Sequence, residues 1–97
     1  DYGCGYGSLV DILNKEKYTD VQGFDISIEL VNRGNGVENI FQIDLPYGLP
    51  IENNSVDCFF LFAVLTCIPE NEFEKELIKK LFSKLKKSGF IYISDYY

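Results

Sequence analysis

The sequence contains no histidine and no methionine, and it has only three cysteines among its 97 residues. Without histidine, and without metal-ligand spacing, Cys4, Cys58 and Cys67 cannot form the usual zinc sites, so we expect no bound metal. An odd number of cysteines also argues against a disulfide framework and predicts a reduced, cytoplasmic protein. The missing initiator methionine indicates that the sequence is a piece of a longer chain.

Long apolar runs and an excess of basic residues are also absent. No apolar run approaches the ~20 residues that span a bilayer, and no signal peptide is visible. Nine basic residues stand against fifteen acidic ones, giving a formal net charge of −6. Because general attraction to phosphate backbones and anionic lipid needs positive charge, we expect neither nucleic acid nor a membrane as a partner.

The composition that is present is typical of a folded domain. The sequence is 46% hydrophobic and 15% aromatic, which predicts a packed core. Its length allows one domain or part of one, and no repeat, low-complexity tract or linker divides it. We therefore interpret residues 1–97 as a single, partial domain.

Short apolar strands alternate with amphipathic helices along the chain. Strands are expected at residues 20–25, 39–44, 56–62 and 90–94, and helices at 8–16, 27–33 and between 71 and 89. This alternation predicts an α/β fold with a doubly wound, mostly parallel sheet. The apolar run at residues 56–62 predicts a strand buried on both faces.

Capping residues mark the expected helix boundaries. Ser8 and Ser27 are predicted N-caps, and Asn71 with Glu74 resembles a capping box. Glycines are predicted to end the helices, at Gly34, Gly36 and Gly89. Apolar residues share one face in the first helix (Leu9, Ile12, Leu13) and one stripe in the last (Phe73, Leu77, Ile78, Leu81, Phe82, Leu85).

Three alternate glycines, Gly3, Gly5 and Gly7, follow Asp1 and precede the first helix. A glycine turn that opens into a helix lets a ligand approach the backbone closely, while the helix amides point toward it. Asp25 and Asp44 end the next two strands, and the carboxyl ends of parallel strands meet at one edge. Asp25, twenty residues after Gly5, suits ribose hydroxyls, and an acid in the position of Asp44 suits the adenine amine. Either acid alone is equally typical of a solvated strand end, but together they favour an adenosine site.

The order of these motifs resembles that of class I S-adenosylmethionine-dependent methyltransferases over essentially all 97 residues. The segments that carry the resemblance are Asp1–Gly7, Gly23–Ser27, Asp44–Leu45, Leu49–Pro50, Asn54–Asp57 and Lys87–Ile93. The resemblance implies a Rossmann-like sheet of seven strands, of which the first and the last two are missing here. It also implies S-adenosylmethionine as cofactor and methyl transfer as the reaction.

The resemblance also assigns cofactor-binding residues. The backbone of the loop at Gly3, Cys4 and Gly5 would hold the methionine part of the cofactor, with Asp1 near its amino group. Asp25 would bind the ribose and Ile26 would pack on the adenine. The remaining contacts would come from Asp44 and Leu45 at the adenine edge and from the backbone at Leu61 or Phe62.

No catalytic base is assigned. Methyl transfer is an in-line displacement, so the protein chiefly orients the reactants. Relatives often carry a histidine where this chain has Cys67, and Ile43 and Ser88 replace a common glycine and proline. Tyr6, Cys67 and Asp95 are the candidate bases nearest the expected pocket.

Two other functions compete with methyl transfer as explanations of these motifs. A nicotinamide-dependent oxidoreductase would need its third glycine at position 8, which is Ser8. A non-catalytic scaffold is disfavoured by the intact Asp1, Asp25 and glycines. The segments that select the acceptor lie outside these residues, and the acidic charge favours a small molecule. Taken alone, the 97 residues are expected to be unstable or to associate through unpaired strand edges.

Overall fold

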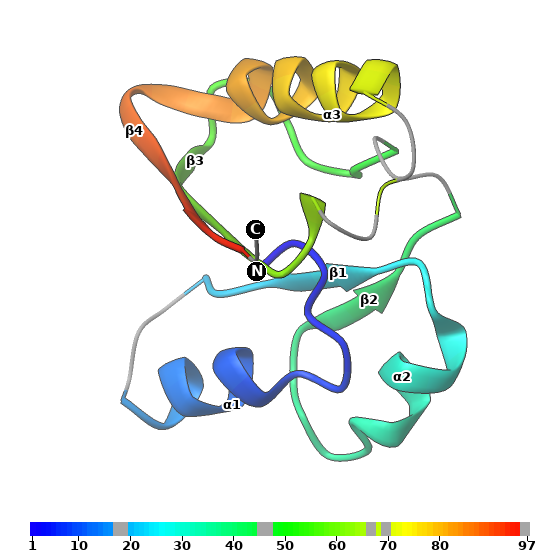
Figure 1. Ribbon diagram of the computed structural model, residues 1–97. Coiled ribbons are helices and arrows are strands. Elements are labelled where there is room, and N and C mark those ends of the chain that lie inside the picture. Colours follow the sequence, from blue (N-terminus) through cyan, green and yellow to red (C-terminus); the bar gives the residue numbers. More distant parts are fainter. Residues whose placement is uncertain (17–19, 45–47, 66–67, 69–70, 96–97) are drawn as a thin grey trace. The chain divides into compact units, whose positions relative to one another are not determined.

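The computed structural model describes residues 1–16, 20–44, 48–65, 68 and 71–95. The chain divides into two compact units, residues 1–46 and 47–97, each built around a pair of parallel strands (Figure 1). The elements in order are α1 (Ser8–Lys15), β1 (Gly23–Asp25), α2 (Ile28–Arg33), β2 (Ile40–Gln42), β3 (Val56–Phe62), α3 (Asn71–Lys84) and β4 (Leu85–Ser94). The predicted α/β class with parallel strands is confirmed.

In the first unit, β1 and β2 pair in parallel, with Phe24 opposite Phe41 and Asp25 opposite Gln42. The chain start lies along the other edge of β1, where Tyr2 forms a parallel bridge with Phe24. Backbone bonds from Phe24 N to Asp1 O (2.9 Å) and from Gly3 N to Phe24 O (2.7 Å) hold it there. Residues 1–3 therefore lead into the glycine loop from a position beside β1.

Both strands of this unit are shorter than predicted at their starts, and β2 also ends at Gln42, two residues before the end predicted at Asp44. Asp20 and Asn39 have φ angles of +58° and +65°, which lie in the left-handed region and cannot continue an extended strand. The strands therefore begin at Gly23 and Ile40.

The helix boundaries of the first unit agree with the prediction in part. Ser27 caps α2, because its Oγ accepts a hydrogen bond from Leu30 N at 3.3 Å, and Gly34 is the C-cap. The N-cap predicted at Ser8 is wrong: Gly7 takes that position, and its carbonyl accepts the first helical bond from Asp11 N. The predicted apolar face of α1 is also wrong in part, since Ile12 is exposed and Val10 is the residue that is fully buried.

In the second unit, β3 and β4 pair in parallel, with Phe60 opposite Tyr92 and Leu61 opposite Ile93. β4 begins directly after α3, so the predicted stop at Gly89 is wrong. The last carbonyls of α3, at Ser83 and Lys84, accept hydrogen bonds from Asn54 N and Ser55 N, which satisfies the helix end without a left-handed glycine. Gly89 instead lies at a register irregularity, where an added Cβ would be 3.0 Å from the carbonyl oxygens of Val56 and Asp57.

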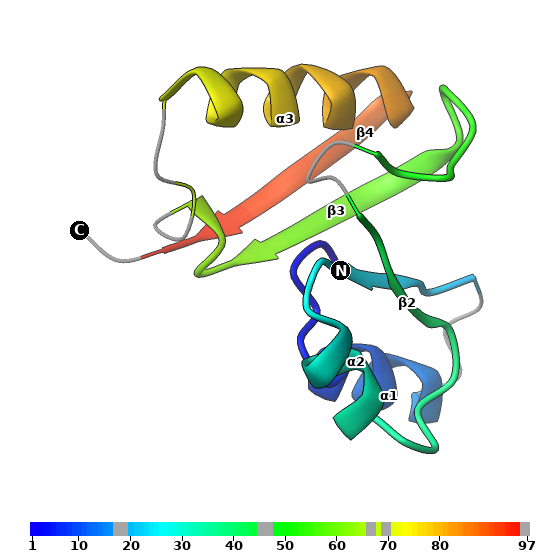
Figure 2. The ribbon, with the colours of Figure 1, turned by 90° about the vertical axis from the view of Figure 1, so that its right-hand side faces the viewer.

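Helix α3 lies along one face of the β3–β4 pair (Figure 2). Leu77 and Leu81 on α3 are fully buried, as is Leu61 on β3. The predicted stripe on α3 is too wide, because Phe73 and Phe82 are exposed. The role predicted for the Asn71 side chain lies outside the described residues.

The other face of this strand pair carries aromatic rings that contact one another. The ring centroids of Phe60 and Tyr92 are 6.4 Å apart, and those of Phe62 and Tyr92 are 5.7 Å apart. Phe62 and Tyr92 are exposed, so the prediction that β3 is buried on both faces is wrong. Among the described parts of the chain, no helix is long and apolar enough to cross a membrane.

Candidate functional site

The glycine loop has left-handed backbone at each of its three glycines. The φ angles are +75° at Gly3, +57° at Gly5 and +87° at Gly7, a conformation that residues with a Cβ rarely adopt. Apart from Gly5 and its two chain neighbours, no described residue has an atom within 4 Å of a Cβ built on Gly5, so one side of the loop is open. The loop therefore offers bare backbone to a ligand directly before α1.

Asp25, the last residue of β1, holds this loop in place. Its Oδ2 accepts a hydrogen bond from Gly5 N at 2.8 Å, and its Oδ1 accepts one from Ser27 N at 2.8 Å. The carboxylate thus ties the loop to the start of α2. The spacing of twenty residues from Gly5 identified Asp25, but the sequence did not predict this bond to the loop.

Gln42 joins two other predicted site residues at the end of β2. Its Nε2 donates to Ile26 O at 3.3 Å, to Ile43 O at 2.9 Å and to Asp44 Oδ1 at 3.3 Å. Ile26 is 56% exposed, and Asp44 is also exposed. Sequence reasoning missed Gln42, since a glutamine at a strand end carries no distinctive signal.

The first unit contains seven of the predicted site residues: Asp1, Gly3, Cys4, Gly5, Asp25, Ile26 and Asp44. Asp1 lies beside the start of β1, where its amino group donates a hydrogen bond to Gln22 O at 2.6 Å. Cys4 can offer only its backbone to a ligand, because its side chain is buried and its Sγ lies 3.6 Å from Gly5 O. Burial, and next the charge of Asp25, raise the pKa of Cys4 to about 11 and that of Tyr2 to about 12. Both side chains are therefore neutral at physiological pH, and both pack in the hydrophobic core.

We expect the raised pKa of Cys4 to make the folded chain less stable in alkaline solution. In the unfolded chain the thiol titrates near its ordinary value of 9.0, and in the folded chain its pKa is about 11. The stabilisation is complete below about pH 9 and is lost as the pH rises through about 11. Between about pH 8 and pH 10, the free energy of unfolding of Cys4→Ala should fall less steeply than that of the wild type. Parallel curves from urea denaturation of the two proteins would contradict this.

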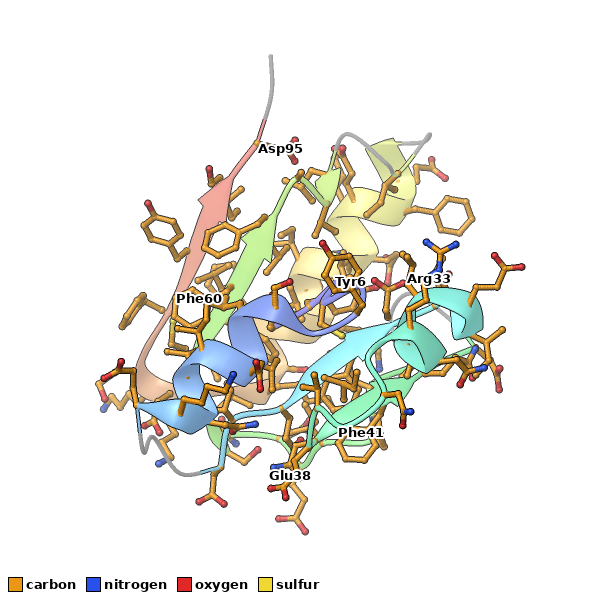
Figure 3. All side chains as sticks on the ribbon, turned by 90° about the horizontal axis from the view of Figure 1, so that it is seen from below. Tyr6, Arg33, Glu38, Phe41, Phe60 and Asp95 are labelled. Carbon is orange, nitrogen blue, oxygen red and sulfur yellow. The ribbon has the colours of Figure 1, made fainter. Side chains whose placement is uncertain are left out.

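The other predicted residues are not part of this cluster. Leu61 lies in the second unit, where its side chain is fully buried, so only its backbone could meet a ligand. Leu45 and Cys67 lie outside the described residues. Tyr6 stands on the glycine loop with 55% of its surface exposed, whereas Asp95 follows β4 in the second unit (Figure 3). No group of three potential metal ligands occurs among the residues that the structure describes.

A glycine turn that leads into a helix, beside a parallel strand ending in an acid, is the arrangement of a Rossmann-like domain. Residues 1–93 match the family described as methyltransferase domain. The chain is also 31% identical over 111 residues to O-methyltransferase 3 of Dictyostelium discoideum, a match that covers 99% of this chain. The chain belongs to the methyltransferase-domain family.

Solved structures share the fold. One is a SAM-dependent methyltransferase from Archaeoglobus fulgidus, with a TM-score of 0.81 and 24% identity over 94% of this chain. Another is a SAM-dependent methyltransferase from Methanosarcina mazei, with a TM-score of 0.85 and 24% identity over 96% of this chain. The chain spans 41% and 49% of these two proteins and 24% of the Dictyostelium protein.

Proposed function

We propose that this chain forms the S-adenosylmethionine-binding part of a methyltransferase. The observation that carries the proposal is the contact between the Asp25 carboxylate and the amide of Gly5. It places the expected ribose acceptor against the expected loop for the methionine part of the cofactor. The family membership and the names of the similar structures support the same cofactor.

The residues of the cluster fit this cofactor. A carboxylate has about four lone-pair sites, so Asp25 can accept ribose hydroxyls while it keeps its bonds to Gly5 and Ser27. The open side of Gly5 admits a ligand against the loop backbone. The exposed side chain of Ile26 can pack on the adenine, and Asp44 can accept from its amine while its Oδ1 keeps the bond from Gln42. Asp1 and the backbone at Leu61 remain proposed contacts of the methionine part, and Leu45 a proposed contact of the adenine.

When bound, S-adenosylmethionine would supply an electrophilic methyl group, so the protein needs chiefly to orient the acceptor and exclude water. We propose a small-molecule acceptor in a reduced, cytoplasmic setting. The name of the Dictyostelium relative supports an acceptor oxygen. If that oxygen carries a proton, Tyr6 and Asp95 are the described candidates to receive it.

Cofactor choice tests the proposal directly. The protein for this test is the complete natural polypeptide that contains residues 1–97. In isothermal titration calorimetry, we expect S-adenosylhomocysteine to bind with a Kd in the micromolar range and NAD to show no binding, because a nicotinamide site needs a glycine at position 8. Binding of NAD alone would favour an oxidoreductase. Binding of neither ligand would favour the non-catalytic scaffold.

Turnover is a separate question from binding. A methyltransferase should convert S-adenosylmethionine to S-adenosylhomocysteine when a panel of small hydroxyl compounds is supplied. Detection of the methylated product by mass spectrometry would identify the acceptor atom. Binding of S-adenosylhomocysteine without turnover on any hydroxyl, amine or thiol acceptor would count against methyl transfer.

A further inference from the structure

Gly34 is the C-cap of α2, and it is buried. Its backbone conformation does not require a glycine. Its φ and ψ angles are −77° and 32°, which residues with a side chain also adopt. A Cβ built at this position would lie 2.5 Å from Tyr6 O and 2.4 Å from Ile40 Cδ1. Close approach of neighbouring atoms, and not backbone conformation, therefore explains the glycine.

The two close atoms differ in how easily they can move. Ile40 Cδ1 is the end of a flexible side chain and can rotate away at little cost. Tyr6 O belongs to the backbone of the glycine loop, and ordinary contact begins at 3.4 Å. A methyl group at position 34 would therefore push the loop by about 1 Å, a displacement large enough to cost a site about 100-fold in efficiency.

We propose that Gly34 is a positioning residue for the cofactor loop. The loop is tied to both ends of α2. The Asp25 carboxylate of β1 joins Gly5 N to Ser27 N at the start of the helix, and Gly34 at its end lies against Tyr6. The inference rests on the proposed function, because it concerns the affinity of the loop for S-adenosylmethionine.

The test compares Gly34→Ala with two other variants in the complete natural polypeptide. Binding is measured by calorimetry at a temperature well below the melting temperature of each variant. We expect Gly34→Ala to bind S-adenosylhomocysteine at least about tenfold more weakly than the wild type. In Gly34→Ala/Ile40→Val the Cδ1 contact is gone and only the Tyr6 contact remains. We expect this variant to bind S-adenosylhomocysteine as weakly as Gly34→Ala, because the contact with Tyr6 O is unchanged.

Gly36→Ala is the matched control. Gly36 has a φ of +92°, and apart from its own and its chain neighbours' atoms, no described atom lies within 4 Å of a Cβ built on it. The substitution should therefore lower the melting temperature through backbone strain, with S-adenosylhomocysteine affinity within about twofold of the wild type. This outcome would separate loss of stability from loss of loop position.

The inference and the proposed function fail in different ways. If the wild type does not bind S-adenosylhomocysteine, the proposed function is wrong. If the wild type binds it and Gly34→Ala binds it equally well, the positioning role is wrong. Recovery of both stability and affinity in the double variant would assign the effect to Ile40 packing and overturn the role of Tyr6. Failure of both Gly34 variants to fold would likewise overturn it, because Gly34 would then serve packing alone.

Discussion

Replacing Asp25 with alanine should weaken S-adenosylhomocysteine binding by roughly 100-fold or more. Two hydroxyl bonds to a carboxylate are each worth about 1.5–3 kcal/mol, and about 1.4 kcal/mol corresponds to tenfold in affinity. The substitution also leaves the amides of Gly5 and Ser27 without the oxygens that accept from them at 2.8 Å. We therefore expect a loss of about 1–3 kcal/mol in the free energy of unfolding as well.

Calorimetry and urea denaturation of the same variants check both effects. Asp11→Ala is the control, because it removes the same charge from α1, where Asp11 pairs with Lys15 on the surface. It should change affinity and stability little. Asp25→Asn keeps one acceptor oxygen and should fall between the wild type and Asp25→Ala. Wild-type affinity in Asp25→Ala would contradict the proposed ribose contact.

Replacing Leu81 with alanine should lower the free energy of unfolding by about 2–5 kcal/mol, the range for truncating a buried leucine. Leu81 lies on α3 with 0% of its surface exposed. The next residue, Phe82, is 62% exposed, so Phe82→Ala should change stability by only about 0.5 kcal/mol. The larger side chain is thus expected to have the smaller effect.

Urea denaturation of the two variants at equal protein concentration measures this difference. The wild type and the two variants should show the same slope with denaturant, so that the midpoints report stability. The comparison tests which side of α3 packs against β3 in the core. Equal destabilisation by the two substitutions would support the wider apolar stripe predicted from the sequence.

Much of the candidate site could be predicted from the sequence because its signals are local. Three alternate glycines before a helix require left-handed backbone and bare peptide groups, whatever surrounds them. Asp25 ends β1 and Asp44 lies two residues after β2, and parallel strands present their carboxyl ends at one edge. The structure has the loop and Asp25 in direct contact.

The wrong predictions share a physical cause. The roles predicted for Gly89 and Ser8 rest on local capping preferences, but Asn54 and Ser55 satisfy the end of α3, and Gly7 caps α1. The strand at Val56–Phe62 is continuously apolar, yet burial depends on what covers each face, and part of its aromatic face is exposed. A capping residue or an apolar run shows what is possible locally, and distant segments decide what is used.

The sequence by itself determined the α/β class, the glycine loop and the acid at the end of β1, because hydrophobic period and turn chemistry are encoded in neighbouring residues. Only the tertiary structure decided that Gln42 joins Ile26 to Asp44 and that Gly34 lies against Tyr6. These contacts join segments that are well separated along the chain. No local preference of a glutamine or a glycine encodes them, so they become visible only when the elements are packed together.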